Sequence, residues 1–280
     1  MSEGAIGERV RVSELWIYPV KGLRGIRLET ADLEPWGLRD DRRFMIVDAN
    51  DRFLTQREEP RLATISATLS DGKLLLQSAA SQQPAIEVAR PTAGATHRVS
   101  VVIWRDMVSA VHVSPAADRW LSAVVGRACR LVYMDRPEQA RPVDAVFGRA
   151  EDRVSFADGF PLLVTNRASQ LALAAMPGCA DVTMQRFRPN VVVEGPAAWA
   201  EDHWRMLTGD GIGLRIVKPC ARCVVTTIDQ ETAVKSPEAE PLRSMATFRR
   251  DGSGKVIFGQ NAIPDGTGRL SVGDVFVVGS

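Results

Sequence analysis

Short stretches of alternating apolar and polar residues, or of β-branched residues, dominate the first half of the chain, and turn signals separate them. This pattern is typical of a β-barrel or β-sandwich. Asp71-Gly72 predicts a two-residue hairpin between two apolar runs, because both positions tolerate positive φ, and Arg105-Asp106 predicts a less ideal one. We expect strands over residues 12–18, 26–33, 43–47, 64–69, 73–77, 99–104 and 107–112.

A helix is predicted to close this first module. Ser114 can cap it, Pro115 suits its first position, an apolar stripe follows over residues 116–125, and Gly126 ends it. The next stretch, residues 135–144, contains two prolines, several charges and few large apolar residues, which is typical of a linker. These signals predict two domains, residues 10–135 and residues 136–280.

The second half of the chain combines strands with a few helices. Residues 167–175 and 240–249 carry helical patterns. Gly209, Gly211 and Gly213 mimic a dinucleotide-binding fingerprint, but a strand follows where that fingerprint needs a helix, so we expect a turn. The fold class is therefore mainly β (α+β), with a few peripheral helices. Further strands are expected over residues 162–165, 191–193, 213–217, 224–228, 255–263 and 275–278.

Length, composition and charge exclude several classes of protein. A chain of 280 residues with 45% hydrophobic residues can bury a sizeable core, which excludes disorder. The formal net charge of +1 provides no overall field for a nucleic acid or an anionic membrane. Residues 1–9 lack the apolar core of a signal peptide, and no stretch reaches the roughly 20 apolar residues of a membrane span, so we expect a cytoplasmic protein. Its four cysteines should be reduced, with Cys129 and Cys179 buried in apolar surroundings.

The pair Cys220 and Cys223 is the strongest chemical signal in the chain. A zinc site would need more ligands at suitable spacing, and a thioredoxin-like redox pair would need a helix where residues 224–228 predict a strand. Lys218 and Arg222 place two cations beside the thiols, which favours the thiolate that binds soft metals. Because residues alternate across a strand, at most one of the two cysteines should face a given site. Zinc, redox and packing roles stay open on these grounds.

Three segments of the second half resemble the MOSC domain, the fold related to the C-terminal part of molybdenum-cofactor sulfurases. They are residues 222–229 (Arg-Cys-Val-Val-Thr-Thr-Ile-Asp), 187–193 (Phe-Arg-Pro-Asn-Val-Val-Val) and 200–204 (Ala-Glu-Asp-His-Trp). Residues 15–22 (Leu-Trp-Ile-Tyr-Pro-Val-Lys-Gly) resemble the MOSC N-terminal β-barrel module. The resemblance covers nearly the whole chain, and it implies an N-terminal β-barrel module followed by a MOSC β-barrel domain.

The resemblance extends to the subgroup that contains the mitochondrial amidoxime-reducing component and its bacterial relatives. It implies a pterin-bound molybdenum cofactor and two-electron reduction of N-hydroxylated bases or amidoximes by oxygen-atom transfer at molybdenum. The implied partners are a small-molecule N-hydroxylated substrate and a separate ferredoxin- or flavin-type electron donor, because the chain contains no iron–sulfur, flavin or nicotinamide motif. The alternatives are a persulfide sulfur carrier for metallocentre assembly and a non-catalytic molybdopterin-binding module.

The same resemblance implies which residues hold the cofactor. Cys223 would be the catalytic residue and the protein ligand to molybdenum, with Cys220 as its neighbour. An anionic pterin phosphate suits cations, guanidinium groups, amides and a helix N-terminus. Gly22 and Ala221 depart from the polar residues of some relatives, so Gly22 offers only its backbone N–H. The implied cofactor-binding residues are Lys21, Gly22, Arg43, Thr165, Asn166, Ala168, Ser169, Arg188, Asn190, Ala221 and Asn261.

Overall fold

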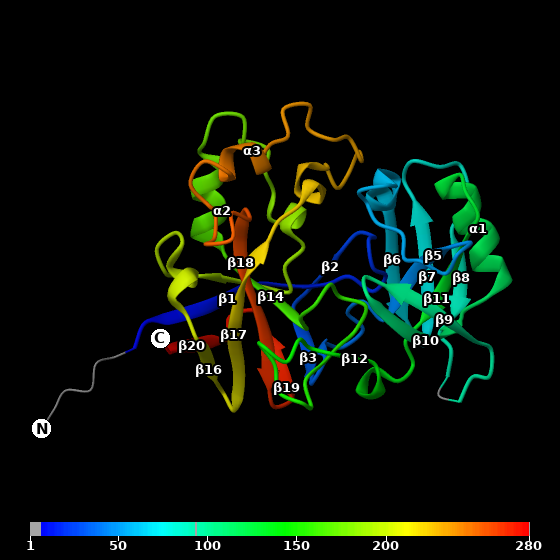
Figure 1. Cartoon of the computed structure of the whole chain (residues 1–280), viewed down its shortest axis with the longest axis horizontal. Coiled ribbons are helices and arrows are strands. Elements are labelled where there is room, and N and C mark those ends of the chain that lie inside the picture. Colours follow the sequence, from blue (N-terminus) through cyan, green and yellow to red (C-terminus); the bar gives the residue numbers. More distant parts are fainter. Residues whose placement is uncertain (1–6, 93, 280) are drawn as a thin grey trace, which may run out of the picture.

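The computed structural model describes residues 7–92 and 94–279, which form a protein built mainly from strands (Figure 1). Its largest element is a closed barrel of β1 (Arg9–Ile17), β14 (Leu162–Asn166), β15 (Val191–Glu194), β16 (Met206–Gly209), β17 (Ile212–Ala221), β18 (Ile257–Asp265) and β20 (Val275–Gly279). The order is β15-β14-β18-β17-β16-β20-β1, and it closes because β1 pairs with both β20 and β15. Neighbouring strands are antiparallel except β14 and β15, which are parallel.

The barrel encloses an apolar core because its strands alternate between inward and outward residues. Along β1, Val10 and Val12 are buried, whereas Arg9 and Arg11 are exposed. Trp204 is also fully enclosed in this core. Burial of one large aliphatic or aromatic side chain stabilises a fold by roughly 1.5–3 kcal/mol, so this alternation fixes the register of the barrel strands.

A second unit lies to the right of the barrel in Figure 1, and we refer to it as the N-terminal unit. One of its sheets has the order β5-β11-β10-β9 and the other the order β6-β7-β8, with α1 packed against the apolar core between them. The elements are β5 (Phe44–Asp48), β6 (Ile65–Ser70), β7 (Lys73–Ser78), β8 (Ile86–Ala89), β9 (Arg98–Ile103), β10 (Asp106–His112), α1 (Pro115–Val125) and β11 (Cys129–Tyr133).

The chain begins in the barrel, enters the N-terminal unit and then returns to the barrel. After β1, β2 (Ile26–Leu28) extends the barrel sheet, and β3 (Thr30–Glu34) pairs with β4 (Gly37–Leu38) and with β19 (Gly268–Ser271). The return passes through β12 (Arg141–Pro142) and β13 (Arg153–Val154). The first strand thus completes a barrel whose other strands all follow residue 160, while a domain boundary at residues 135 and 136 stays a prediction.

The remaining helices cover the ends and sides of the two units. They are α2 (Arg167–Ala174), α3 (Leu242–Met245) and the 3-10 helices η1 (Pro60–Thr64), η2 (Pro137–Gln139), η3 (Met184–Phe187), η4 (Ala200–His203) and η5 (Val224–Thr227). In Figure 1, α2 and α3 lie together above one end of the barrel. Within the described residues, no helix has the length and apolar character needed to cross a membrane.

The structure confirms the helix cap, the helix end and the hairpin turn that the sequence predicts in the N-terminal unit. The Ser114 side chain accepts a hydrogen bond from the Ala117 N–H, and Gly126 ends α1 in the left-handed conformation. Asp71 and Gly72 have φ values of 48° and 74° and connect β6 to β7 as a two-residue hairpin. These features depend on a few adjacent residues, which explains why the sequence pattern is sufficient to find them.

Three predicted elements outside the segment of Cys220 and Cys223 differ in the structure. The turn predicted at Arg105-Asp106 lies one residue earlier, because Ile103 pairs with Asp106 and Trp104 takes a φ of 54°. The strand over residues 26–33 divides into β2 and β3, which join different sheets. The helix over residues 240–249 contracts to α3, since Arg250 already pairs with Val256 in a β-bridge.

Candidate functional site

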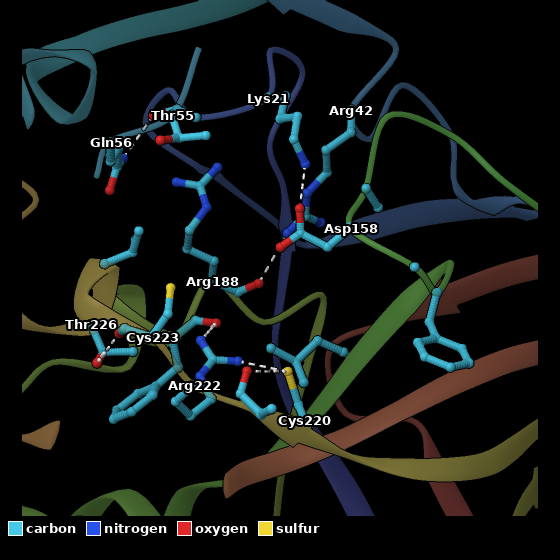
Figure 2. A pocket seen from close by; sticks show the side chains of 18 of the residues that line it. Lys21, Arg42, Thr55, Gln56, Asp158, Arg188, Cys220, Arg222, Cys223 and Thr226 are labelled. Atoms are coloured by element: carbon cyan, nitrogen blue, oxygen red, sulfur yellow. Dashed lines mark hydrogen bonds and ion pairs between the residues drawn. The ribbon is translucent and has the colours of Figure 1, made fainter. Parts of the chain in front are cut away.

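A cleft between the barrel and the N-terminal unit brings together segments that are distant in sequence (Figure 2). It has a volume of about 170 Å³ and contains both members of the cysteine pair. Its lining comes from residues 21–22, 53–57, 157–163, 187–190 and 220–226, together with Arg42 and Asn261.

The segment that carries Cys220 and Cys223, which we call the cysteine loop, comprises the last residues of β17 and the turn that follows it. The register of β17 against β18 shifts between Pro219 and Ala221, and the Arg222 N–H then donates to the Val256 carbonyl. The prediction that no more than one cysteine faces the site is wrong, because this irregularity breaks the alternation and both cysteines line the cleft.

The two thiols have different surroundings. Cys223 is exposed, and Figure 2 shows its sulfur pointing toward the wall that carries Thr55 and Gln56. Cys220 is half-buried, and its sulfur accepts a hydrogen bond of 2.9 Å from Arg222 Nη1. Arg222 therefore contacts Cys220, and Cys223 presents the more accessible sulfur to a ligand.

The strand predicted after Cys223 is wrong, because residues 224–227 form the 3-10 helix η5. Thr226 Oγ1 donates to the Cys223 carbonyl at 2.9 Å, and Thr227 Oγ1 donates to the Val224 carbonyl at 2.7 Å. Such local side-chain bonds favour a turn over the extended conformation that β-branched residues prefer. They hold the residues directly after Cys223 in a compact turn.

Lys21 and Asp158 form an ion pair across the cleft, with 2.5 Å between Nζ and Oδ1 (Figure 2). Burial lowers the pKa of Lys21, and the Asp158 carboxylate opposes this shift. Desolvation in the cleft acts to raise the pKa of Asp158, whose side chain is still 74% exposed to solvent, but the Lys21 ammonium and a hydrogen bond from Trp104 hold that pKa well below its ordinary range. The Asp158 carboxylate is therefore ionised at neutral pH.

Arg42 and Arg188 form a second cationic group around a buried tyrosine. Their guanidinium carbons lie 4.2 and 4.1 Å from the centroid of the Tyr18 ring. Burial raises the pKa of Tyr18 to about 12, although both arginines oppose the shift, so the phenol is neutral. Burial lowers the pKa of Arg188 to about 10, so its guanidinium keeps its charge at neutral pH.

Asn190 supports this arrangement with hydrogen bonds to protein groups. Its Oδ1 accepts hydrogen bonds from Arg42 Nη1 at 3.0 Å and from the Leu163 N–H at 3.2 Å, and its Nδ2 donates to the Trp16 carbonyl. Asn190 is buried, and the amide is satisfied on both sides. Its contacts fix Arg42 against the cleft wall and leave the guanidinium of Arg188 as the freer donor.

The structure brings seven of the predicted site residues to the cleft and places five elsewhere. Those that line it are Lys21, Gly22, Arg188, Asn190, Ala221, Cys223 and Asn261. Arg43, Thr165, Asn166, Ala168 and Ser169 do not line it. The Arg43 guanidinium instead donates twice to the Met134 carbonyl, so the neighbouring Arg42 takes the position facing the cleft.

The predicted anion site at residues 165–169 is filled by protein side chains. Asn166 caps α2 by accepting from the Ala168 N–H, and Ser169 Oγ donates to the carboxyl of Glu201 at 2.8 Å. Thr165 is buried, with its hydroxyl against the sulfur of Met184. Burial raises the pKa of Glu201, so this cluster is a buried acid held by neutral donors, away from the cleft lining.

Sequence reasoning missed several cleft residues that come from turns. Arg42 stands beside Arg43, and only its left-handed φ of 48° decides which of the two faces the cleft. Arg57 and Asp158 lie in loops without periodicity, so no pattern points to them. The Asp158-Gly159 dipeptide is a local turn signal, but it does not indicate that Asp158 lies in a site.

Clusters of side chains that could bind a metal ion without a cofactor are absent from the described residues. Across residues 7–92 and 94–279, no three His, Cys, Asp or Glu side chains lie close enough together to hold a metal ion.

Comparison with known proteins gives two domain matches and several relatives of similar length. Residues 9–128 match the MOSC N-terminal beta barrel domain, and residues 151–277 match the MOSC domain. The chain is 33% identical to mitochondrial amidoxime-reducing component 1 of Mus musculus, over 96% of this chain and 82% of that protein. It is 31% identical to the Homo sapiens protein of the same name, over 96% of this chain and 83% of that one.

A molybdenum cofactor sulfurase of Danio rerio is also similar, at 31% identity over 90% of this chain and 32% of that protein. The N-terminal match includes β1 of the barrel as well as most of the N-terminal unit, and the MOSC match includes the other barrel strands. The chain thus belongs to the family of MOSC proteins with an N-terminal β-barrel domain that contains the mitochondrial amidoxime-reducing components.

Proposed function

We propose that this protein is a molybdenum-cofactor-dependent reductase of N-hydroxylated compounds such as amidoximes and N-hydroxylated bases. The observation that carries the proposal is the cleft, in which the exposed thiol of Cys223 faces several cationic side chains. Asp158 is the single carboxylate that the described residues bring to its lining. The relatives named as amidoxime-reducing components and as a molybdenum cofactor sulfurase support a function related to this cofactor.

The chemistry of the cleft fits a phosphate-bearing pterin that carries a soft metal. The Cys223 sulfur has a free approach from the cleft, and a thiolate is a suitable ligand for such a metal. Arg188 has no carboxylate within 4.0 Å in the described part of the chain. Its Nη1 donates to the Leu23 carbonyl at 2.7 Å, and its remaining donors could bind a phosphate. Lys21 would supply an ammonium group and Asn261 an amide from other parts of the cleft lining.

In the proposed reaction the N–O bond of the substrate breaks, two electrons and two protons are consumed, and water leaves. The bound cofactor would supply the redox centre for this two-electron step. The residues of the chain would hold the cofactor through Cys223 and the cations, and Phe53 and Phe160 would supply apolar parts of the cleft lining. The electrons would come from a separate ferredoxin- or flavin-type partner, and we place the protein in the cytoplasm.

The decisive experiment is elemental and pterin analysis of protein purified from a host that makes the cofactor. Wild type and Cys220→Ala should contain molybdenum and pterin, and Cys223→Ala should lose the metal. With reduced viologen as donor, the first two proteins should reduce benzamidoxime and the third should not. Wild-type protein without metal and pterin would exclude the proposal, and cyanide-labile sulfur on Cys223 in such protein would support the persulfide carrier.

A further inference from the structure

The segment of residues 53–57 forms the wall of the cleft opposite the cysteine loop (Figure 2). Gln56 is buried and exchanges two amide hydrogen bonds of 3.1 Å with Gln230, and its Nε2 also donates to the Gly22 carbonyl at 2.7 Å. These bonds tie the segment both to the N-terminal unit and to the residues that follow η5. The next residue, Arg57, is therefore presented to the cleft from a fixed backbone.

Arg57 differs from the cations that have a carboxylate partner in the cleft. Lys21 is paired with Asp158 and Arg42 with Asp41, whereas no carboxylate of the described residues lies within 4.0 Å of the Arg57 guanidinium. Its Nε is buried and has no hydrogen-bond partner. A partly desolvated guanidinium with unused donors favours an anion that fits its planar fork.

Trp104 explains why Arg57 stays unpaired although Asp158 is close to the same wall. The Trp104 ring lies 4.9 Å from the Arg57 guanidinium carbon, and its Nε1 donates to Asp158 Oδ1 at 3.3 Å. The indole therefore holds the carboxylate on the Lys21 side and stacks against Arg57. The Phe53 ring, 4.9 Å from that of Trp104, completes an aromatic surface next to the unpaired cation.

We propose that Arg57 is a specificity-determining residue that binds a carboxylate or phosphate on the substrate. The inference rests on the proposed function and names its substrate class: planar N-hydroxylated compounds that carry an anionic group. Trp104 is 39% exposed, so the surface beside Arg57 is open to a molecule that arrives from solvent. A planar substrate can stack on the aromatic surface while its anion bonds the guanidinium fork.

The test compares two substrates that differ in charge and have nearly the same shape. Molybdenum-loaded wild type should reduce 4-carboxybenzamidoxime with a kcat/KM about tenfold above that of its neutral methyl ester, mainly through a lower KM. Arg57→Gln should lose this preference, so that its kcat/KM values for the acid and the ester become similar, and Arg57→Lys should keep part of it. Arg52→Gln removes the same charge from an exposed position near the cleft segment and should behave like wild type.

A second pair of compounds distinguishes a phosphate from a carboxylate. An N-hydroxylated nucleoside 5′-monophosphate is compared with its uncharged nucleoside, and a larger preference in this pair would assign the site to phosphates. Calorimetric binding of the product 4-carboxybenzamidine adds a readout that does not depend on turnover, and Arg57→Gln should weaken this binding about tenfold.

Several results would overturn the inference. Equal kcat/KM values for acid and ester in wild type would do so, as would equal binding of the product to wild type and Arg57→Gln. If Arg57→Gln loses pterin and slows both substrates alike, Arg57 binds the cofactor instead. Failure of the proposed function gives another pattern, in which loaded wild type reduces neither the acid nor the ester.

Discussion

Arg222 donates a hydrogen bond from Nη1 to the sulfur of Cys220 at 2.9 Å, and its Nη2 donates to the Phe187 carbonyl at 2.6 Å. The guanidinium thus joins the cysteine loop to the turn that precedes Arg188. Because Cys223 follows directly, the contact fixes the backbone from which the exposed thiol projects. Cys220 then has a structural task as an acceptor for Arg222.

Replacement of Cys220 should separate this structural task from metal binding. Cys220→Ser retains an acceptor for Arg222 and should leave the free energy of unfolding within about 0.5 kcal/mol of wild type, whereas Cys220→Ala leaves a donor unpaired and should cost about 1 kcal/mol. Urea unfolding measures both values, and metal analysis should find molybdenum in both variants. Loss of metal from Cys220→Ala, with retention in Cys223→Ala, would reverse the ligand assignment.

Asp158 competes with any anionic ligand for Lys21. Its side chain is 74% exposed and its carboxylate is the only one among the described residues that line the cleft, while Lys21 itself is 9% exposed. Asp158→Asn keeps the shape and removes the charge, so cofactor-free protein should bind inorganic pyrophosphate about threefold to tenfold more tightly. Calorimetry at low salt measures the dissociation constant. Unchanged or weaker binding would show that the ion pair does not oppose the ligand.

The buried acid beside α2 should make stability depend on pH. Burial raises the pKa of Glu201 in the folded state, whereas the unfolded chain has a value of about 4.3. As pH rises above that value, the unfolded state loses its proton first, so the free energy of unfolding falls until the folded-state pKa is passed. Below the unfolded value both states are protonated and the group contributes no pH dependence.

Glu201→Gln should remove this dependence, since the amide keeps an acceptor for Ser169 and does not titrate. The difference in unfolding free energy between the variant and wild type should therefore grow in favour of the variant as pH rises above about 4.3, as measured in urea. Glu151→Gln changes an exposed carboxylate and serves as the control. A difference that stays constant as pH rises above that value would contradict a raised pKa of Glu201 in the folded state.

Features that depend on adjacent residues could be predicted from the sequence, and those that depend on long-range packing could not. The cap at Ser114 and the hairpin at Asp71 require only local groups. By contrast, the Lys21–Asp158 pair joins residues 137 positions apart, and the sequence around each residue does not indicate that the two meet. The cleft lining is of this second kind, because it forms where two units meet.

The errors near the site have the same origin. Alternation along a strand predicts one cysteine in the cleft, but the register shift at the end of β17 brings both there. Arg43 fits the resemblance in sequence position, yet the left-handed turn at Arg42 exchanges the directions of the two side chains. Backbone geometry of this kind is decided by the surrounding packing, which a one-dimensional pattern does not contain.

Gly259 holds β18 close to β14 beside the cleft, and its substitution should cost more than that of a glycine with a similar backbone. Its φ is 72°, and a Cβ would lie 2.7 Å from Thr165 Cγ2 and 2.8 Å from the Val164 carbonyl oxygen. Gly72 has a φ of 74°, but a Cβ there would meet nothing within 4 Å. An alanine at either position would therefore have an unfavourable positive φ, but only an alanine at position 259 would also clash with its neighbours.

Gly72→Ala should therefore lower the free energy of unfolding by about 1 kcal/mol, the cost of a left-handed non-glycine residue. Gly259→Ala should lower it by about 3 kcal/mol, because overpacking against a backbone carbonyl adds to that cost. Urea unfolding at neutral pH measures both. The shift of β18 should also displace Asn261, so Gly259→Ala should retain less pterin than Gly72→Ala. Equal destabilisation of the two variants would contradict this prediction, because it would mean that β14 can move away from the new Cβ without a loss of stability.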